Sequence, residues 1–286
     1  MGMRIGAHMS VAGGKDKAFE RGLGIRCETI QIFIRSVRSW SSGQLDKSEI
    51  NKFLKKKNEL TEQIWPIISH NSYLINLAGT EEEKLEKSVD AMIDELTKAE
   101  QLHLDYVNMH PGNKDPDEEE QPALERIAHQ LNGLIQETQG SEVKILLETT
   151  AGQGNDLGYK FEHMRDIIKK IRNKERIGVT FDTAHSFAAG YDFTTKTAYE
   201  SVMQDFDDII GLEYLYVLHF NDSAKELGSR VDRHAHIGEG KIGREPFGYF
   251  LNDNKLKDLP GILETPKGKN MEGFKKDLKV LRKLRE

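Results

Sequence analysis

Short apolar segments of strand length recur along the chain and alternate with amphipathic segments of helical length. The clearest helical pattern is an apolar face spaced by three and four residues among Glu and Lys, formed by Leu85, Val89, Met92, Ile93 and Leu96. Eight apolar segments predict β-strands, over residues 4–7, 29–33, 65–68, 106–109, 144–147, 177–181, 215–218 and 261–263. Strands that alternate with helices favour a parallel sheet, and eight such units predict a closed α/β barrel of the (β/α)8, or TIM, type.

One such barrel accounts for the length of the chain. A (β/α)8 barrel needs about 250 residues, and this chain has 286, with no long linker, low-complexity tract or internal repeat. Hydrophobic residues make up 37% of the sequence and charged residues 31%, which is enough apolar material for a large core. We therefore expect residues 1–286 to form a single domain.

The composition limits where in the cell we expect the protein and which partners we expect it to bind. No apolar run approaches the roughly 20 residues of a membrane helix, and no signal peptide opens the chain. The single cysteine, Cys27, cannot form an internal disulfide, so we expect a cytoplasmic protein with no membrane partner, in which Cys27 is a buried structural thiol. The formal net charge of −6 argues mildly against a nucleic-acid partner. Bound divalent ions would, however, make an acidic cleft locally positive.

Residues able to bind a metal ion follow seven of the eight predicted strands. In chain order they are His8, His70, His110, Glu148, Asp182, His219 and Glu264. The carboxyl ends of all strands in such a barrel meet at one mouth, where active sites lie, so these side chains should converge on one cleft. A buried carboxylate is costly there unless it is paired or metal-bound. The pattern predicts a metal site at the C-terminal mouth of the strands.

Two local motifs enlarge this set. Asp182 and His185 stand three residues apart just past the sixth strand, and Asp232 and His234 alternate in an extended loop. The candidate ligands then number nine: His70, His110, Glu148, Asp182, His185, His219, Asp232, His234 and Glu264. Nitrogen and oxygen donors without cysteine suit zinc, with manganese or iron as alternatives, and nine of them suit two or three ions. We interpret His103, His129 and His163, in predicted helical stretches, as ordinary hydrogen-bonded histidines.

Longer motifs surround these positions. In order they include Gly6-Ala7-His8, His70-Asn71-Ser72-Tyr73-Leu74, His110-Pro111-Gly112, Leu147-Glu148-Thr149-Thr150, Phe181-Asp182-Thr183-Ala184-His185, His219-Phe220-Asn221-Asp222, Ser229-Arg230-Val231-Asp232-Arg233-His234, Gly238-Glu239-Gly240 and Ile262-Leu263-Glu264-Thr265. Over essentially the whole chain they resemble the endonuclease IV family, the zinc-dependent apurinic/apyrimidinic endonucleases of base-excision repair.

The resemblance implies three Zn²⁺ ions per chain, with Mn²⁺ as an alternative at one or more sites. By position, the first ion would be held by His70, His110 and Glu148, the second by Glu148, Asp182, His219 and Glu264, and the third by His185, Asp232 and His234. Glu148 would therefore be the bridging, catalytic carboxylate. His8 would lie at the cleft without being a ligand.

The resemblance also implies the reaction. We expect hydrolysis of the phosphodiester 5′ to an abasic site in double-stranded DNA, leaving a 3′ hydroxyl and a 5′ deoxyribose phosphate, and removal of 3′ blocking groups. A hydroxide between the first two ions would attack phosphorus, and the third ion would stabilise the departing oxygen. Arg38, Tyr73 and Leu74 would enter the duplex from its minor-groove side. Without the resemblance, Tyr73 and Leu74 would be interpreted as packing residues. We expect a monomer.

Residues outside the metal set depart from the family pattern in places. Ser36, Thr149, Ala184 and Ala224 stand where the family usually has Asn, Asn, Cys and Lys, and Lys225 comes one residue after the usual lysine position. None is an implied ligand, so these departures bear on DNA contacts rather than on the metal site. Further candidates for phosphate contacts are Lys15, Arg35, Arg230, Arg233 and Lys241.

Two other classes of protein compete with this interpretation. A sugar isomerase or epimerase of the xylose-isomerase-like barrel class also places Glu, Asp and His at strand ends around one or two divalent ions. Such an enzyme needs neither the third ligand group, formed by His185, Asp232 and His234, nor an exposed pair such as Tyr73 and Leu74. A binding protein stabilised by structural zinc would favour a closed, cysteine-rich site, which the sequence lacks.

Overall fold

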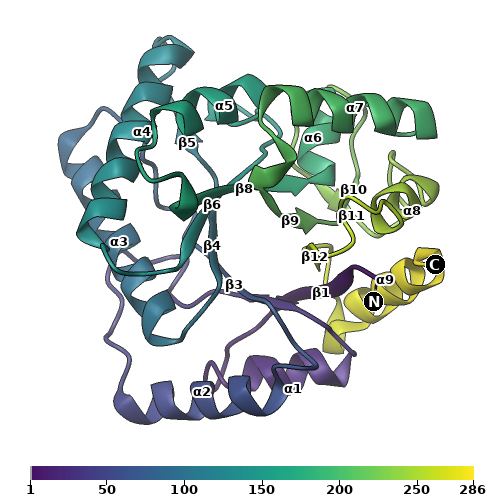
Figure 1. Cartoon of the computed structure of the whole chain (residues 1–286), viewed down its shortest axis with the longest axis horizontal. Helices are drawn as coiled ribbons and strands as arrows, with labels where there is room; N and C mark the ends of the chain where they lie inside the picture. The colour runs from purple at the N-terminus through teal and green to yellow at the C-terminus, as the bar shows by residue number, and fades with distance from the viewer. Residues whose placement is uncertain (1) are drawn as a thin grey trace.

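A closed barrel of eight parallel strands forms the centre of the computed structural model, which describes residues 2–286 (Figure 1). Around the barrel the strands are β1 (Arg4–Met9), β2 (Ile30–Ile32), β3 (Ile67–His70), β4 (Tyr106–Met109), β6 (Lys144–Glu148), β8 (Ile177–Asp182), β9 (Leu215–His219) and β12 (Pro260–Leu263), which pairs with β1 again. Each predicted strand overlaps one of these. The predicted fold is confirmed.

Helices follow the strands and surround the barrel (Figure 1). They are α1 (Lys17–Gly24), α2 (Lys47–Leu60), α3 (Glu82–Gln101), α4 (Glu120–Glu137), α5 (Phe161–Lys170), α6 (Thr183–Ala189), α7 (Lys196–Ile209), α8 (Glu245–Leu251) and α9 (Glu272–Leu284), with 3-10 turns at Lys174–Arg176, Leu212–Tyr214 and Lys269–Met271. Among residues 2–286, no helix combines the length and the apolar character that crossing a membrane would require.

The barrel strands are buried on both faces. This explains why their sequences are continuous apolar runs rather than alternating apolar and polar residues. Every residue of β8 is buried, for example, because the barrel interior covers one face and helices cover the other. Close packing between strands also restricts which residue type fits at certain positions. A Cβ atom at Gly6 of β1 would lie 1.7 Å from the carbonyl oxygen of Thr29, so only glycine fits there.

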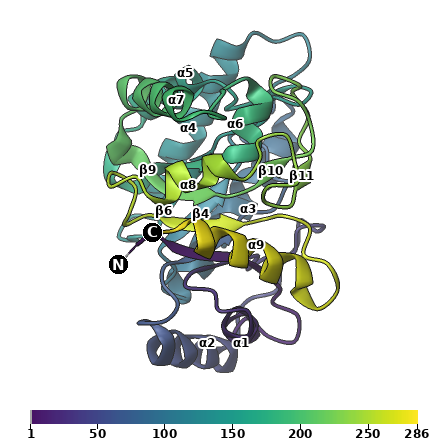
Figure 2. The same ribbon diagram turned by 90° about the vertical axis from the view of Figure 1, so that its right-hand side faces the viewer.

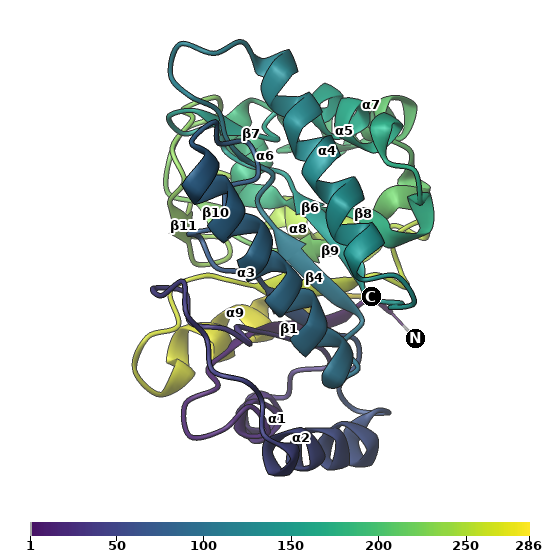
Figure 3. The ribbon, with the colours of Figure 1, turned by 90° about the vertical axis from the view of Figure 1, so that its left-hand side faces the viewer.

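Helix α3 lies along the outside of the barrel beside β4 (Figure 3). Its predicted apolar face packs inward, with Met92 and Leu96 fully buried. The helix also buries Glu95 and Lys98, whose charges the amphipathic pattern assigns to the solvent side. These two residues are therefore exceptions to the predicted pattern.

Two short antiparallel ribbons shape the loops at one end of the barrel. Strand β5 (Gly112–Asn113) pairs with β7 (Asp156–Leu157), and β10 (Asp222–Ser223) pairs with β11 (His234–Ala235). The β10–β11 ribbon lies at the opposite end of the molecule from the two chain termini (Figures 2 and 3). These ribbons, which the sequence pattern does not predict, stiffen loops at the C-terminal mouth of the strands.

Candidate metal centre

Eight of the nine candidate ligands lie in three linked groups, on the barrel strands or on the segments that follow them. Within each group, one donor atom of every residue lies within 4.8 Å of those of the others. The groups are His70, His110 and Glu148; Glu148, Asp182, His219 and Glu264; and Asp182, His185 and His234. Glu148 and Asp182 each belong to two groups, so the three groups form one continuous cluster at the mouth of the barrel.

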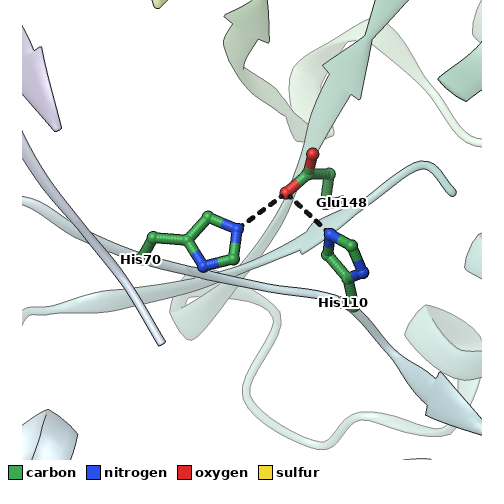
Figure 4. Close-up of side chains that lie close together, drawn as sticks. All are labelled: His70, His110 and Glu148. Carbon is green, nitrogen blue, oxygen red and sulfur yellow. Dashed lines mark hydrogen bonds and ion pairs between the residues drawn. The ribbon is translucent and has the colours of Figure 1, made fainter. Parts of the chain in front are cut away.

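Two imidazoles face one carboxylate oxygen in the first group (Figure 4). Nε2 of His70 lies 3.3 Å from Oε2 of Glu148, and Nε2 of His110 lies 3.6 Å from the same oxygen. His70 and Glu148 are buried, whereas the side chain of His110 is half-buried. The group is thus accessible from the mouth on the His110 side.

The other oxygen of Glu148 faces the second group. Oε1 of Glu148 lies 3.0 Å from Nδ1 of His219, and the same nitrogen lies 3.3 Å from Glu264 and 3.7 Å from Asp182. One carboxylate therefore presents Oε2 to one ligand group and Oε1 to another. This is the arrangement that a metal-bridging carboxylate requires.

Asp232, the ninth candidate, lies beside His185 and His234 on the solvent side of the third group. Its Oδ1 lies 3.3 Å from Nε2 of both His185 and His234, and those two nitrogens lie 3.3 Å apart. At 41% exposure, the Asp232 side chain is more open to solvent than those of its two histidine neighbours. The third group is therefore open to solvent on its Asp232 side.

Four of the five histidines are held in a tautomer suited to metal binding. A carbonyl oxygen can only accept a hydrogen bond, so each ring nitrogen beside one must donate, and in the neutral ring the lone pair is then on the opposite nitrogen. The pairs are His70 Nδ1 with the Asn71 carbonyl at 2.9 Å, His185 Nδ1 with the Thr149 carbonyl at 2.9 Å, His219 Nε2 with Oε1 of Gln31 at 2.9 Å and His234 Nδ1 with the Glu264 carbonyl at 3.3 Å.

Buried amide side chains orient the carboxylates. Gln31 accepts from His219 and donates to Glu264, and Asn108 donates to Oε2 of Glu148. Asn221 donates to Asp182 at 2.6 Å and accepts the backbone N–H of Glu264 at 2.8 Å. The sequence pattern predicts no role for these three amides. For Gln31 and Asn108, the available signal was a polar residue inside the apolar runs 29–33 and 106–109.

Ionisation of these groups fits a cation site. Burial lowers the pKa of His110 to about 4, so this ring is neutral at pH 7. Burial would raise the pKa of Glu148, but the charge and the hydrogen bond of His219 oppose this and help to hold the pKa well below its usual value. Burial likewise opposes the charge of His219, yet Glu264 and Glu148 raise its pKa well above the usual value. Buried carboxylates here need compensating cations, and the nitrogen and oxygen donor set fits zinc or manganese.

A buried turn holds the loop that carries Asp232 and His234. The carboxylate of Asp222 accepts backbone N–H groups from Gly238 at 2.9 Å and Gly240 at 3.0 Å. A Cβ atom at residue 240 would lie 2.4 Å from that carboxylate, so the turn requires Gly240. The two motifs around residues 219–222 and 238–240 are thus one structural unit.

The residues predicted to contact DNA lie on two loops beside this cluster. The Tyr73 side chain is 63% exposed, and its ring centre lies 5.3 Å from that of His70 and 6.0 Å from that of His110. Leu74 is half-buried and borders a surface cavity of about 230 Å³ together with Trp40. Arg38 is exposed on the loop before Trp40.

Several other predicted positions can be placed. Cys27 is buried, as expected, and His8 lies 3.6 Å from Glu264 but outside the three ligand groups. The expectation that Arg35 contacts phosphate is wrong, because its side chain is buried and paired with Asp94. His103 lies in the turn after α3 rather than in a helix.

Fold and ligand groups together place the chain in a class of barrel proteins. Residues 21–284 match the family described as "Xylose isomerase-like TIM barrel". A "Probable endonuclease 4" of Chloroflexus aurantiacus is 43% identical over 281 residues, 98% of each chain. An "Apurinic-apyrimidinic endonuclease" of Caenorhabditis elegans is 40% identical over 268 residues, 94% of this chain and 67% of that protein.

Comparison with solved structures gives the same result as comparison of sequences. The crystal structure of endonuclease IV from Thermus thermophilus superposes with a TM-score of 0.85 at 36% identity, over 98% of each chain. A D-tagatose 3-epimerase-like protein gives a TM-score of 0.71 at 19% identity over 98% of this chain and 99% of that one, a likeness that shows the fold alone. The chain belongs to the endonuclease IV family.

Proposed function

We propose that this protein hydrolyses the phosphodiester 5′ to abasic sites in double-stranded DNA, leaving a 3′ hydroxyl and a 5′ deoxyribose phosphate. As a member of its family it is a deoxyribonuclease IV, a phosphoric diester hydrolase that acts in DNA repair. The observation that carries the proposal is Glu148, whose two oxygens face two separate ligand groups. DNA with blocked 3′ ends is a further proposed substrate, and the proposed acting unit is a monomer.

Three divalent ions, most of them zinc, are the proposed cofactors. The residues that would hold them are His70, His110 and Glu148; Glu148, Asp182, His219 and Glu264; and His185, Asp232 and His234. When bound, divalent ions lower the pKa of water to about 7 and stabilise the negative charge that develops on the phosphate and the leaving oxygen.

The protein's own residues prepare this chemistry. Glu148 is ionised and fully buried, and the Asn108 amide fixes the direction of its Oε2. Gln31 locks the tautomer of His219 and the position of Glu264 at the same time. Because these groups are held before substrate arrives, little reorganisation is needed during the reaction.

Recognition is assigned to the two neighbouring loops. Tyr73 is exposed directly above His70 and His110, so a side chain inserted into DNA there would hold the strand next to the ligand groups. An abasic site lacks one stacked base, which lowers the cost of opening the duplex. Tyr73 and Leu74 would act as the wedge, and Arg38 would enter beside them.

The third ligand group favours this function over sugar isomerisation. A barrel that acts on a small sugar needs one or two ions, whereas His185, His234 and Asp232 provide an additional set at the open side of the mouth. A long substrate that crosses the mouth can reach this set.

Nicking of depurinated plasmid DNA tests the proposal. The purified protein should convert depurinated supercoiled plasmid to the open circle and leave untreated plasmid intact. Removal of metal by a chelator should abolish nicking, and added Zn²⁺ or Mn²⁺ should restore it. Equal nicking of both plasmids, or none in metal-replete protein, would contradict the proposed activity.

A further inference from the structure

The segment between β2 and α2 has no regular secondary structure, although it carries Arg38 and Trp40. Side-chain hydrogen bonds close it on itself and connect it to a neighbouring loop. Arg35 donates to the backbone carbonyl of Trp40 at 2.8 Å, which closes the segment on itself. Ser72 donates to the carbonyl of Val37 at 3.2 Å, which connects the segment to the loop of Tyr73 and Leu74.

Buried charges on α3 lie directly beneath this segment. Lys98 is 1% exposed, and its ammonium group contacts Oδ2 of Asp94 at 2.6 Å and Oγ of Ser42 at 2.8 Å. The same Asp94 oxygen pairs with the guanidinium of Arg35, which is 3% exposed. Glu95, fully buried, lies beside them and accepts a hydrogen bond from Ser69 of β3.

We propose that Arg35, Asp94 and Lys98 are positioning residues for lesion recognition, which clamp the segment carrying Arg38 to α3, next to the loop carrying Tyr73 and Leu74. Asp94 joins the two cations, Arg35 lies near the beginning of the segment, and Lys98 holds its later part through Ser42. The inference rests on the proposed function, because it assumes that these two loops contact DNA.

Energetics favour a geometric role for this cluster. A buried ion pair contributes little stability compared with apolar residues of similar size, because desolvating the charges cancels much of their attraction. Charge-assisted hydrogen bonds do fix distance and direction. Without regular structure of its own, the segment depends on such contacts to hold Arg38 in one place.

Replacement of the buried lysine tests the clamp. Lys98→Met keeps the length of the side chain and removes its bonds to Asp94 and Ser42. The control is Lys87→Met on the same helix, where the lysine pairs with Glu83 but is 48% exposed. Ser42→Ala removes the loop side of the bond and leaves the buried charges in place, so it serves if Lys98→Met fails to fold.

Two readouts separate the clamp from the DNA contact. In native-state digestion with trypsin, cleavage after Arg38 should be about tenfold faster in Lys98→Met than in wild type or Lys87→Met, the scale expected for one lost charged hydrogen bond. KM for a duplex with one abasic site should rise about tenfold, with kcat within about threefold of wild type. Ser42→Ala should shift both readouts in the same direction. The variant that combines Lys98→Met with Ser42→Ala should be no worse than Lys98→Met alone, because Lys98→Met already removes the bond to Ser42.

Each alternative result has a definite meaning. Unchanged cleavage after Arg38 in both Lys98→Met and Ser42→Ala would overturn the clamp. Faster cleavage with an unchanged KM, where Arg38→Ala does raise KM, would overturn the role of the cluster in recognition. An unchanged KM in Arg38→Ala would overturn the proposed DNA contact itself, and trypsin cleavage would still decide whether the cluster anchors the segment.

Discussion

Glu148 combines properties that a single carboxylate rarely has. It is completely buried, yet its pKa lies well below the usual value because histidines and hydrogen-bond donors surround it. Removing its charge would leave His219 and the second ligand group without their shared partner. At the scale of the residue, the proposed activity depends on this side chain more than on any other.

Glu148→Gln should keep the fold and lose several orders of magnitude in nicking rate, because an amide cannot bridge two cations with two anionic oxygens. Nicking of an abasic duplex measures the loss, and circular dichroism checks the fold. Glu142→Gln, the same change at an exposed residue before β6, is the matched control. A rate for Glu148→Gln within about tenfold of wild type would show that the bridge is misassigned.

Glu95 makes a different prediction, on stability. Burial raises the pKa of Glu95 from 4.5 to about 7, although Ser69 and Arg35 favour the charged form. Between about pH 4.5 and 7 the folded protein therefore keeps a proton that the unfolded chain has lost, so the free energy of unfolding falls as the pH rises over this range and levels off above about 7.

Gln at position 95 cannot ionise. The thermal midpoint of Glu95→Gln should therefore rise relative to that of wild type as the pH rises from 5 to 8. Melting curves of both proteins over this range give the difference directly. A difference that does not change with pH would mean that Glu95 is ionised throughout, held by Arg35.

Loops rather than strands set the expected specificity at the scale of the element. The β10–β11 ribbon and the Asp222 turn position Asp232 and His234, whereas Tyr73 and Leu74 follow β3 directly. If Tyr73 and Leu74 act as the proposed wedge, their closeness to His70 would place inserted DNA at a fixed distance from the ligand groups.

Replacing Tyr73 and Leu74 together by Ala should leave the ligand groups intact. The double variant should cleave an exposed lesion, such as a blocked 3′ end at a gap, at nearly the wild-type rate. On an abasic site within intact duplex, a loss of about 2–3 kcal/mol would lower kcat/KM roughly 30- to 150-fold. Both substrates are measured at the same salt concentration. An equal fall on both would assign the loop to general binding or to the metal site.

Sequence patterns predict the strands well because each is buried on both faces and reads as an apolar run. The two-residue strands of the ribbons carry no periodicity, so no pattern could reveal them. Glu95 and Lys98 escape prediction for another reason. Along one helix they resemble solvated charges, and only the packing of α3 against the barrel and the 35–42 segment shows that they are buried.

Barrel architecture is what makes the candidate site predictable at the scale of the whole molecule. The candidate ligands are spread from residue 70 to residue 264 in the sequence. They lie close together because every barrel strand ends at the same mouth. The supporting amides Gln31 and Asn108 lie within strands, where a polar residue could equally bond to the backbone. Their roles require the three-dimensional arrangement.

Metal content per chain tests the central claim most directly. Nine nitrogen and oxygen donors in linked groups should hold about three divalent ions, mostly zinc, at roughly three protein ligands per ion with shared carboxylates. Elemental analysis of gently purified protein, with nicking activity measured on the same sample, should therefore find about three ions per chain. A reproducible value of one or fewer in fully active protein would contradict the account.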